Sequence, residues 1–155
     1  SKQPWFANTI FLITADHCAS SAGRTEIPLE KYHIPALIYA PGFVEPQHVG
    51  GIVSQIDLMP TLLSLLNMSY DSHFYGRSIY DEGYVNRAFI ATYQDLGYLE
   101  GDTFTILSPV RRFEQYRVVP TEDNPHNLEP METENPEQVS RAIGYYQTSS
   151  AWNKR

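Results

Sequence analysis

The first part of the chain alternates between short apolar runs and a longer helical pattern. Residues 8–14 and 34–40 are continuous apolar runs of strand length, and the first is rich in β-branched side chains. Such a run is typical of a strand buried on both faces, as in a parallel sheet. From Ser54 apolar side chains recur at three- and four-residue steps, which predicts a helix to about residue 67, with Ser54 as its N-cap and Pro60 in its first turn. The order strand, loop, strand, helix predicts an α/β organisation.

The second part of the chain has the pattern of short strands followed by a helix. Strand-like segments occupy residues 87–93, 96–100, 103–107 and 114–119. The tight link over residues 100–102 predicts a hairpin. Residues 120–136 are rich in Pro, Asn and Glu and contain acids but no Lys or Arg, which predicts a solvated surface loop. From Glu137 an amphipathic period predicts a final helix to about Trp152.

Length and charge limit the class of protein. The chain has 155 residues, the usual size of one domain, and 42% of them are hydrophobic, which is enough for a packed core. The formal net charge is -7 and no basic cluster is longer than Arg111-Arg112, so the electrostatic footprint of a nucleic-acid binder is missing. No apolar run approaches the ~20 residues needed to span a bilayer. The single cysteine, Cys18, excludes an intrachain disulfide and a thiolate zinc site.

Asp16 and His17 have the clearest chemical signature in the chain. They directly follow the first predicted strand, and open parallel sheets bind ligands beyond the carboxyl ends of their strands. A carboxylate supplies a charged hard oxygen and an imidazole supplies a borderline nitrogen, a donor set that suits a divalent cation. Taken alone, the dipeptide is equally consistent with an Asp that caps the next turn and a His packed beside it.

Four stretches of sequence occur in a specific order: ITADHCASSAG, YHIPALIYAPG, VSQIDLMPTLLSLLNM and FYGRSI. In this order and spacing they resemble the carboxyl-terminal part of the alkaline phosphatase/sulfatase superfamily, and most closely its sulfatase-like branch of lipoteichoic acid synthases and phosphoglycerol transferases. The resemblance covers roughly residues 9–79, about half of the chain, and is looser beyond. It implies the carboxyl-terminal portion of an alkaline-phosphatase-like α/β sandwich, with short parallel strands and helices, a small antiparallel strand cluster and a C-terminal helix.

The resemblance also implies a metal-dependent enzyme. In this family a nucleophilic Thr, Ser or modified Cys attacks phosphorus or sulfur, and the group passes through a covalent intermediate to water or an acceptor alcohol. Asp16 and His17 fall on two metal-ligand positions, for which Mn2+ is expected rather than Ca2+ or Mg2+. The nucleophile and the remaining ligands lie in the family's amino-terminal half, which nothing in this chain matches. The chain is therefore expected to be inactive alone and to depend on the remainder of the parent polypeptide.

Three more residues are candidates for binding the anionic group of a substrate. His48 lies in the loop before the predicted helix, His33 precedes the second strand, and Arg24 follows the first. Each can face a phosphate, and each is also compatible with an ordinary surface or core position. Cys18 stands where many relatives have Gly, and without an adjacent Lys or Arg it is expected to be an inert loop residue. Asp57 is expected to be a helix-start residue rather than a catalytic acid.

The expected organisation is a single structural unit with two parts. Residues 1–80 would carry the core with the Asp-His metal half-site, and residues 81–155 the strand cluster, the acidic loop and the closing helix. The resemblance implies that the substrate is a phosphoglycerol lipid, a glycan or a sulfate ester. It also implies a periplasmic or extracellular enzyme that upstream segments anchor in the membrane. The isolated chain is a candidate homo-oligomer. Two alternatives stay open: a true sulfate-ester hydrolase of the arylsulfatase type, and a non-catalytic carboxyl-terminal domain for binding or packing.

Overall fold

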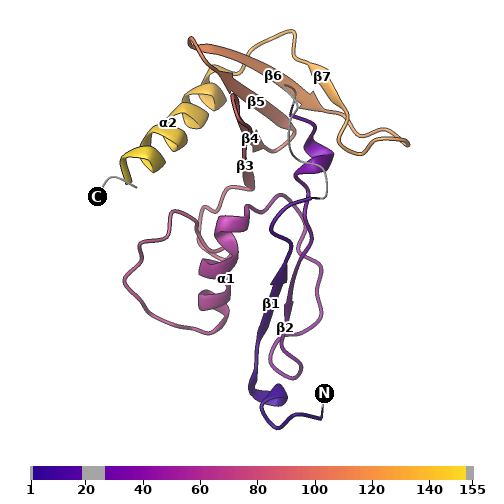
Figure 1. Cartoon of the computed structure of the whole chain (residues 1–155), viewed down its shortest axis with the longest axis vertical. Helices are drawn as coiled ribbons and strands as arrows, with labels where there is room; N and C mark the ends of the chain where they lie inside the picture. The colour runs from indigo at the N-terminus through magenta and orange to yellow at the C-terminus, as the bar shows by residue number, and fades with distance from the viewer. Residues whose placement is uncertain (1, 19–26, 153–155) are drawn as a thin grey trace.

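The computed structural model describes residues 2–18 and 27–152, which form two β-sheets and two α-helices (Figure 1). A two-stranded sheet and the shorter helix occupy the lower half of the view, and a five-stranded sheet with the longer helix occupies the upper half. The predicted fold class, a mixed α/β unit with an antiparallel strand cluster and a C-terminal helix, is confirmed. Within the described residues, no helix is long and apolar enough to cross a membrane.

Strands β1 (Phe11–Thr14) and β2 (Ala36–Tyr39) form the two-stranded sheet. Both lie where the sequence predicts them, but they pair antiparallel, and the parallel arrangement expected from their apolar runs is not found between them. The parallel direction was expected only because a continuous apolar run predicts burial on both faces. The expected burial on both faces is also absent, because Ile13 and Leu37, which lie opposite each other, are 54% and 55% exposed.

The predicted helix is present as a 3-10 turn, η3 (Gln55–Asp57), that continues into α1 (Leu58–Leu65). Pro60 lies in the first turn of α1, as predicted, where a missing N–H is tolerated. Ser54 occupies the N-cap position of η3, but its hydroxyl donates to the backbone carbonyl of Arg87 at 3.0 Å instead of capping the helix. The start of the helix is thereby tied to the beginning of the next sheet.

The five-stranded sheet is antiparallel, with its strands in chain order: β3 (Arg87–Ala91), β4 (Leu96–Glu100), β5 (Thr103–Ser108), β6 (Arg112–Val118) and β7 (Leu128–Pro130). The first four strands confirm the prediction, as does the hairpin between β4 and β5, which turns at Gly101 with a φ of 60°. The stretch predicted as a loop over residues 120–136 contains β7, so that prediction is wrong in part. Leu128 pairs with Val118 in a strand of three residues, which is too short to produce a recognisable alternation.

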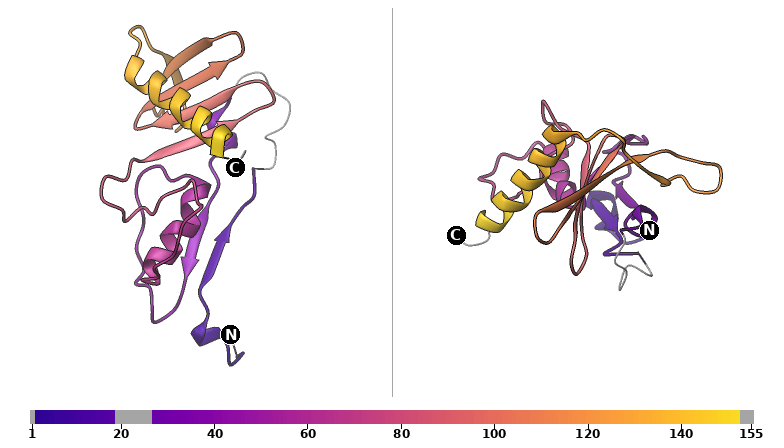
Figure 2. Two further views of the ribbon diagram at one scale, coloured as in Figure 1. Left: turned by 90° about the vertical axis from the view of Figure 1, so that its left-hand side faces the viewer. Right: turned by 90° about the horizontal axis from the view of Figure 1, so that it is seen from above.

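Helix α2 (Pro136–Trp152) lies across one face of this sheet (Figure 2) and confirms the predicted closing helix. Its side chains bond directly to strand carbonyls. Gln138 Nε2 donates to the carbonyl of Thr103 at 2.8 Å, and the Tyr146 hydroxyl lies 2.9 Å from the carbonyl of Ile90 and 2.7 Å from that of Gly97. These bonds anchor the helix along β3, β4 and β5.

The apolar core lies on the opposite face of the sheet. Ile27 and Leu29 pack there against Ile90 and Phe104, and all four are buried. The Phe104 ring occupies the space above Gly97, where an added Cβ would lie 2.8 Å from ring carbons. The segment that begins at Ile27 is thus packed against the sheet. Its next residues lead into β2, which borders the candidate site.

Candidate functional site

Asp16 and His17 lie just beyond the carboxyl end of β1, at the place that the sequence predicts for a ligand. Only Ala15 separates them from the strand. Its carbonyl accepts a hydrogen bond from Gln55 Nε2 at 3.1 Å, so η3 holds the turn that presents the two side chains. Both are open to solvent, because the Asp16 side chain is 87% exposed and that of His17 is 68% exposed. Their position leaves room for an external ligand.

A backbone carbonyl fixes the orientation of the His17 imidazole. Nδ1 lies 2.8 Å from the carbonyl oxygen of Cys18, and because a carbonyl only accepts, Nδ1 is the donor and carries the proton. In the neutral ring Nε2 then has a free lone pair, and it lies 3.5 Å from Oδ2 of Asp16. The other carboxylate oxygen, Oδ1, accepts the backbone N–H of His17 at 2.9 Å. An imidazole whose second nitrogen donates to a backbone carbonyl is the usual form of a metal-bound histidine.

This donor set fits one half of a divalent-cation site. Asp16 offers a charged oxygen and His17 an oriented nitrogen beside it. Within residues 2–18 and 27–152, no group of three or more His, Cys, Asp or Glu residues is placed to hold a metal ion. Asp16 and His17 offer two potential ligand atoms, and the described part of the chain places no third His, Cys, Asp or Glu beside them.

A groove of about 1240 Å³ runs beside these two residues. Its lining includes Asp16 and His17 together with His33 and His48, so four of the predicted site residues border the same groove. Apolar side chains from β2 and from the core face of the five-stranded sheet form much of the rest of its wall. The fifth candidate, Arg24, lies outside the described residues. The substrate-binding roles of His33, His48 and Arg24 stay predictions.

The groove also contains His126, a residue that no sequence pattern singled out. Its Nε2 lies 3.1 Å from Nδ1 of His33, and the two rings meet edge to face with centroids 5.1 Å apart. The thiol of Cys18 lies 3.4 Å from the backbone carbonyl of His33. His33 and His126 are 93 positions apart, and no local periodicity links residues at that separation.

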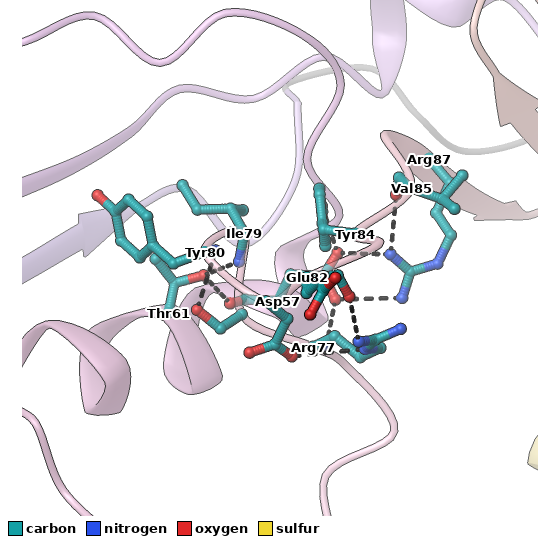
Figure 3. Close-up of polar contacts among 11 residues, drawn as sticks. Asp57, Thr61, Arg77, Ile79, Tyr80, Glu82, Tyr84, Val85 and Arg87 are labelled. Carbon is teal, nitrogen blue, oxygen red and sulfur yellow. Dashed lines mark hydrogen bonds and ion pairs between the residues drawn. The ribbon is translucent and has the colours of Figure 1, made fainter.

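A buried charge cluster joins the start of α1 to β3 (Figure 3). The side chains of Asp57 and Arg87 are 0% and 2% exposed, and the guanidinium nitrogens of Arg87 lie 3.2 and 3.3 Å from the two carboxylate oxygens. Oδ2 also accepts from the Tyr84 hydroxyl at 2.9 Å, and Oδ1 from the backbone N–H of Arg77 at 2.8 Å. Asp57 lies at the helix start, as predicted, and its carboxylate is engaged on both oxygens by these structural bonds.

In this cluster the Asp57 carboxylate and the Tyr84 phenol are both engaged in bonds that position the chain. Burial raises the pKa of Tyr84, and the hydrogen bond to Asp57 and its negative charge raise it further, so the phenol stays a proton donor. Arg87 Nε is buried without a hydrogen-bond partner among the described residues. A Cβ at Gly76 would overlap the backbone carbonyl of Ile56, so the turn before β3 lies directly against η3.

Two comparisons with known proteins bear on this arrangement. A family model described as Sulfatase matches residues 3–68, which contain β1, β2, α1 and the Asp16-His17 pair. The crystal structure of a protein in the alkaline phosphatase superfamily from Vibrio parahaemolyticus matches with a TM-score of 0.84 and 28% sequence identity, over 99% of this chain and 37% of that one. The chain thus spans just over a third of the length of this relative.

The chain is thus similar to a protein of the alkaline phosphatase superfamily over nearly its whole length, and to the Sulfatase family model over residues 3–68. The resemblance inferred from the four sequence segments is confirmed at the level of the superfamily. Neither match separates the phosphoglycerol transferase branch from the other sulfatase-like branches.

Proposed function

We propose that this chain supplies half of the divalent-metal site of a sulfatase-like enzyme that transfers or hydrolyses phosphoglycerol, phosphate or sulfate ester groups. Asp16 and His17 are its two ligands, and Mn2+ is the preferred ion. The nucleophile and the remaining ligands come from the rest of a larger parent polypeptide, so the chain is inactive alone. The 37% coverage of the superfamily structure supports this division of the site.

The observation that carries the proposal is the orientation of His17. The Cys18 carbonyl places the proton on Nδ1, and Nε2 is left beside the Asp16 carboxylate at 3.5 Å. Two unprotonated ligand atoms held next to each other on the surface gain most from a cation between them. An ion pair between a protonated His17 and Asp16 is the alternative explanation of the same geometry, and measurement of metal binding separates the two.

The roles of the chain's own residues follow from their chemistry. Asp16 contributes the negative charge that attracts a cation, and His17 contributes a neutral nitrogen in a fixed orientation. When bound, a divalent cation supplies Lewis-acid stabilisation of charge on the phosphoryl or sulfuryl oxygens. His48 and Arg24, with His33, are proposed to bind the anionic ester group in the groove. The parent's nucleophile attacks the group that they orient.

The test compares Asp16→Asn and His17→Ala with Asp123→Asn in the parent enzyme. Asp123 is an exposed acid in the acidic loop and serves as the matched control. Mn2+ binding, measured by electron paramagnetic resonance, and turnover of a phosphoglycerol lipid should both be lost in the first two variants and retained in the third. The isolated chain should show no metal-dependent turnover. The proposal is contradicted if Asp16→Asn leaves the Mn2+ affinity of the parent unchanged. It is also contradicted if the isolated chain shows robust turnover that Asp16→Ala abolishes.

A true sulfate-ester hydrolase is the second candidate, because the matching family model carries the description Sulfatase. Turnover of an aryl sulfate in preference to a phosphoglycerol lipid by the parent would favour it, as would a Cys-type nucleophile in the parent's upstream sequence. A non-catalytic packing domain would instead show no Mn2+ affinity that depends on Asp16 or His17.

The proposed localisation is periplasmic or extracellular, with a membrane anchor in upstream segments of the parent. It rests on the resemblance to phosphoglycerol transferases. The proposed partners are the remainder of the parent and a phosphoglycerol lipid, a glycan or a sulfate ester. Labelling of the parent in intact cells by a membrane-impermeant reagent tests the localisation, and protection from the reagent counts against it.

A further inference from the structure

The two histidines that meet across the groove come from different parts of the fold. His33 lies between the 3-10 turn η2 (Leu29–Lys31) and β2, and His126 lies in the loop between β6 and β7. Nδ1 of His33 and Nε2 of His126 are 3.1 Å apart, and the ring planes are inclined by 71°. His33 is exposed and His126 is half-buried, so an ion from solvent can reach the pair.

The distance between the two nitrogens is close to that of two ligands on one metal ion. Zinc–nitrogen bonds of about 2.0–2.1 Å at a tetrahedral angle place two ligand nitrogens about 3.4 Å apart. The observed 3.1 Å differs from this by a few tenths of an ångström.

We infer that His33 and His126 form a two-histidine binding site for a borderline transition-metal ion such as Zn2+ or Cu2+, with the remaining coordination positions filled by water or an anion. The donor set consists of imidazole alone, which suits zinc and copper and offers no hard oxygen for Mn2+. The site is thus chemically distinct from Asp16 and His17, and it does not depend on the function proposed for them. His33 would have this metal-binding role in addition to the anion-binding role proposed above.

Proton balance at this site requires no other reactant. Without metal the two nitrogens share one proton, as donor and acceptor of a hydrogen bond. On metal binding the donor ring moves that proton to its other nitrogen, and both facing nitrogens then present lone pairs to the ion. Each histidine stays neutral.

The ion would link two segments that lie 93 positions apart in the sequence. It would fasten the loop between β6 and β7 to the segment that leads into β2, at the wall of the groove that both histidines line. A ligand that binds only the folded state raises its stability with increasing ligand concentration. Zinc should therefore raise the melting temperature of the chain.

The experiment uses the 155-residue chain without an affinity tag. Zn2+ binding is measured by calorimetry, and Cu2+ binding by electron paramagnetic resonance, for the wild type and for His33→Ala, His126→Ala and the matched control His73→Ala. Loss of either ligand should lower Zn2+ affinity by at least the factor of about 10–100 that loss of a supporting group costs a metal site. His73→Ala, at an exposed histidine outside the groove, should leave it unchanged.

Further measurements keep the inference falsifiable. The wild-type Cu2+ spectrum should show coupling to two imidazole nitrogens, a result that requires no variant to fold. Asp16→Asn and Cys18→Ser should retain Zn2+ binding. The inference is overturned if the wild type binds Zn2+ no better than His126→Ala. It is also overturned if Asp16→Asn or Cys18→Ser removes the Zn2+ binding. A third contrary result is that His33→Ala weakens anion binding by the parent while its Zn2+ affinity stays unchanged.

Discussion

The buried pair of Asp57 and Arg87 makes a quantitative prediction about stability. Asp57→Asn leaves a guanidinium that is 2% exposed, with its Nε already unpartnered among the described residues, and removes the negative charge that offsets it. Breaking a buried ion pair from one side costs about 3–5 kcal/mol, because the remaining charge is uncompensated. The free energy of unfolding of a domain is about 5–15 kcal/mol, so the variant should lose a large part of it.

Urea unfolding of the purified chain, followed by circular dichroism and tryptophan fluorescence, measures this loss. Asp102→Asn is the matched control. Asp102 pairs with Arg117 at 3.7 Å on the surface, and the two side chains are 62% and 57% exposed. An exposed pair of this kind contributes about 0–1 kcal/mol, so the control should unfold near the wild-type urea concentration.

Equal losses in Asp57→Asn and Asp102→Asn would refute the reasoning. If Asp57→Asn does not fold cooperatively, the double variant Asp57→Asn with Arg87→Met provides the comparison. It removes both charges, keeps a side-chain oxygen at position 57 for the donors of Tyr84 and Arg77, and should be more stable than Asp57→Asn because no buried charge is left unpaired. A double variant as unstable as the single one would show that the lost stability does not come from the unpaired charge.

Three further predictions concern packing and pH. Gly97→Ala places a methyl group 2.8 Å from the buried Phe104 ring and should cost about 1–3 kcal/mol in urea unfolding, so wild-type stability would contradict the packing described for that face. Gly76→Ala drives a methyl group into the backbone carbonyl of Ile56 and should cost about 3 kcal/mol or more, which the same assay checks. Burial raises the pKa of Tyr146 from 10.0 to about 12, so the folded state favours the neutral phenol. The free energy of unfolding should fall as the pH rises from about 10 towards 12, and Tyr146→Phe should reduce that slope; an unchanged slope would count against the bonded, protonated phenol.

Local patterns in the sequence were sufficient for most of the elements. The apolar steps that follow Ser54 and those that follow Glu137 belong to helices, because a helix buries one face at a fixed period. The hairpin at Gly101 was also predictable, since a tight link between two strand-like runs has few other solutions. Strand β7 was missed because three residues, one of them proline, have no period.

Features that depend on distant residues could not be predicted in this way. The direction of β2 relative to β1 depends on the path between them, and apolar runs do not encode it. The pairing of His33 with His126 and that of Asp57 with Arg87 depend on the completed fold. The position of Asp16 and His17 at a strand end was predictable, whereas the carbonyl that orients the His17 ring belongs to a turn whose geometry appears only in the structure.

The attachment of Asp16 and His17 to the end of β1 has a consequence for how tightly a cation can be held. The two residues follow the last pair of the β1–β2 ladder, Thr14 opposite Ala36, with only Ala15 between. Strand pairing and the Gln55 bond to Ala15 therefore fix the backbone of both residues when the chain folds. The conformational entropy of ordering that backbone is lost on folding, so it does not weaken the binding of a cation. Fraying of this one ladder end would move both ligands together. Hydrogen exchange at the amides of β1 and β2 would therefore report on the preorganisation of the proposed metal half-site.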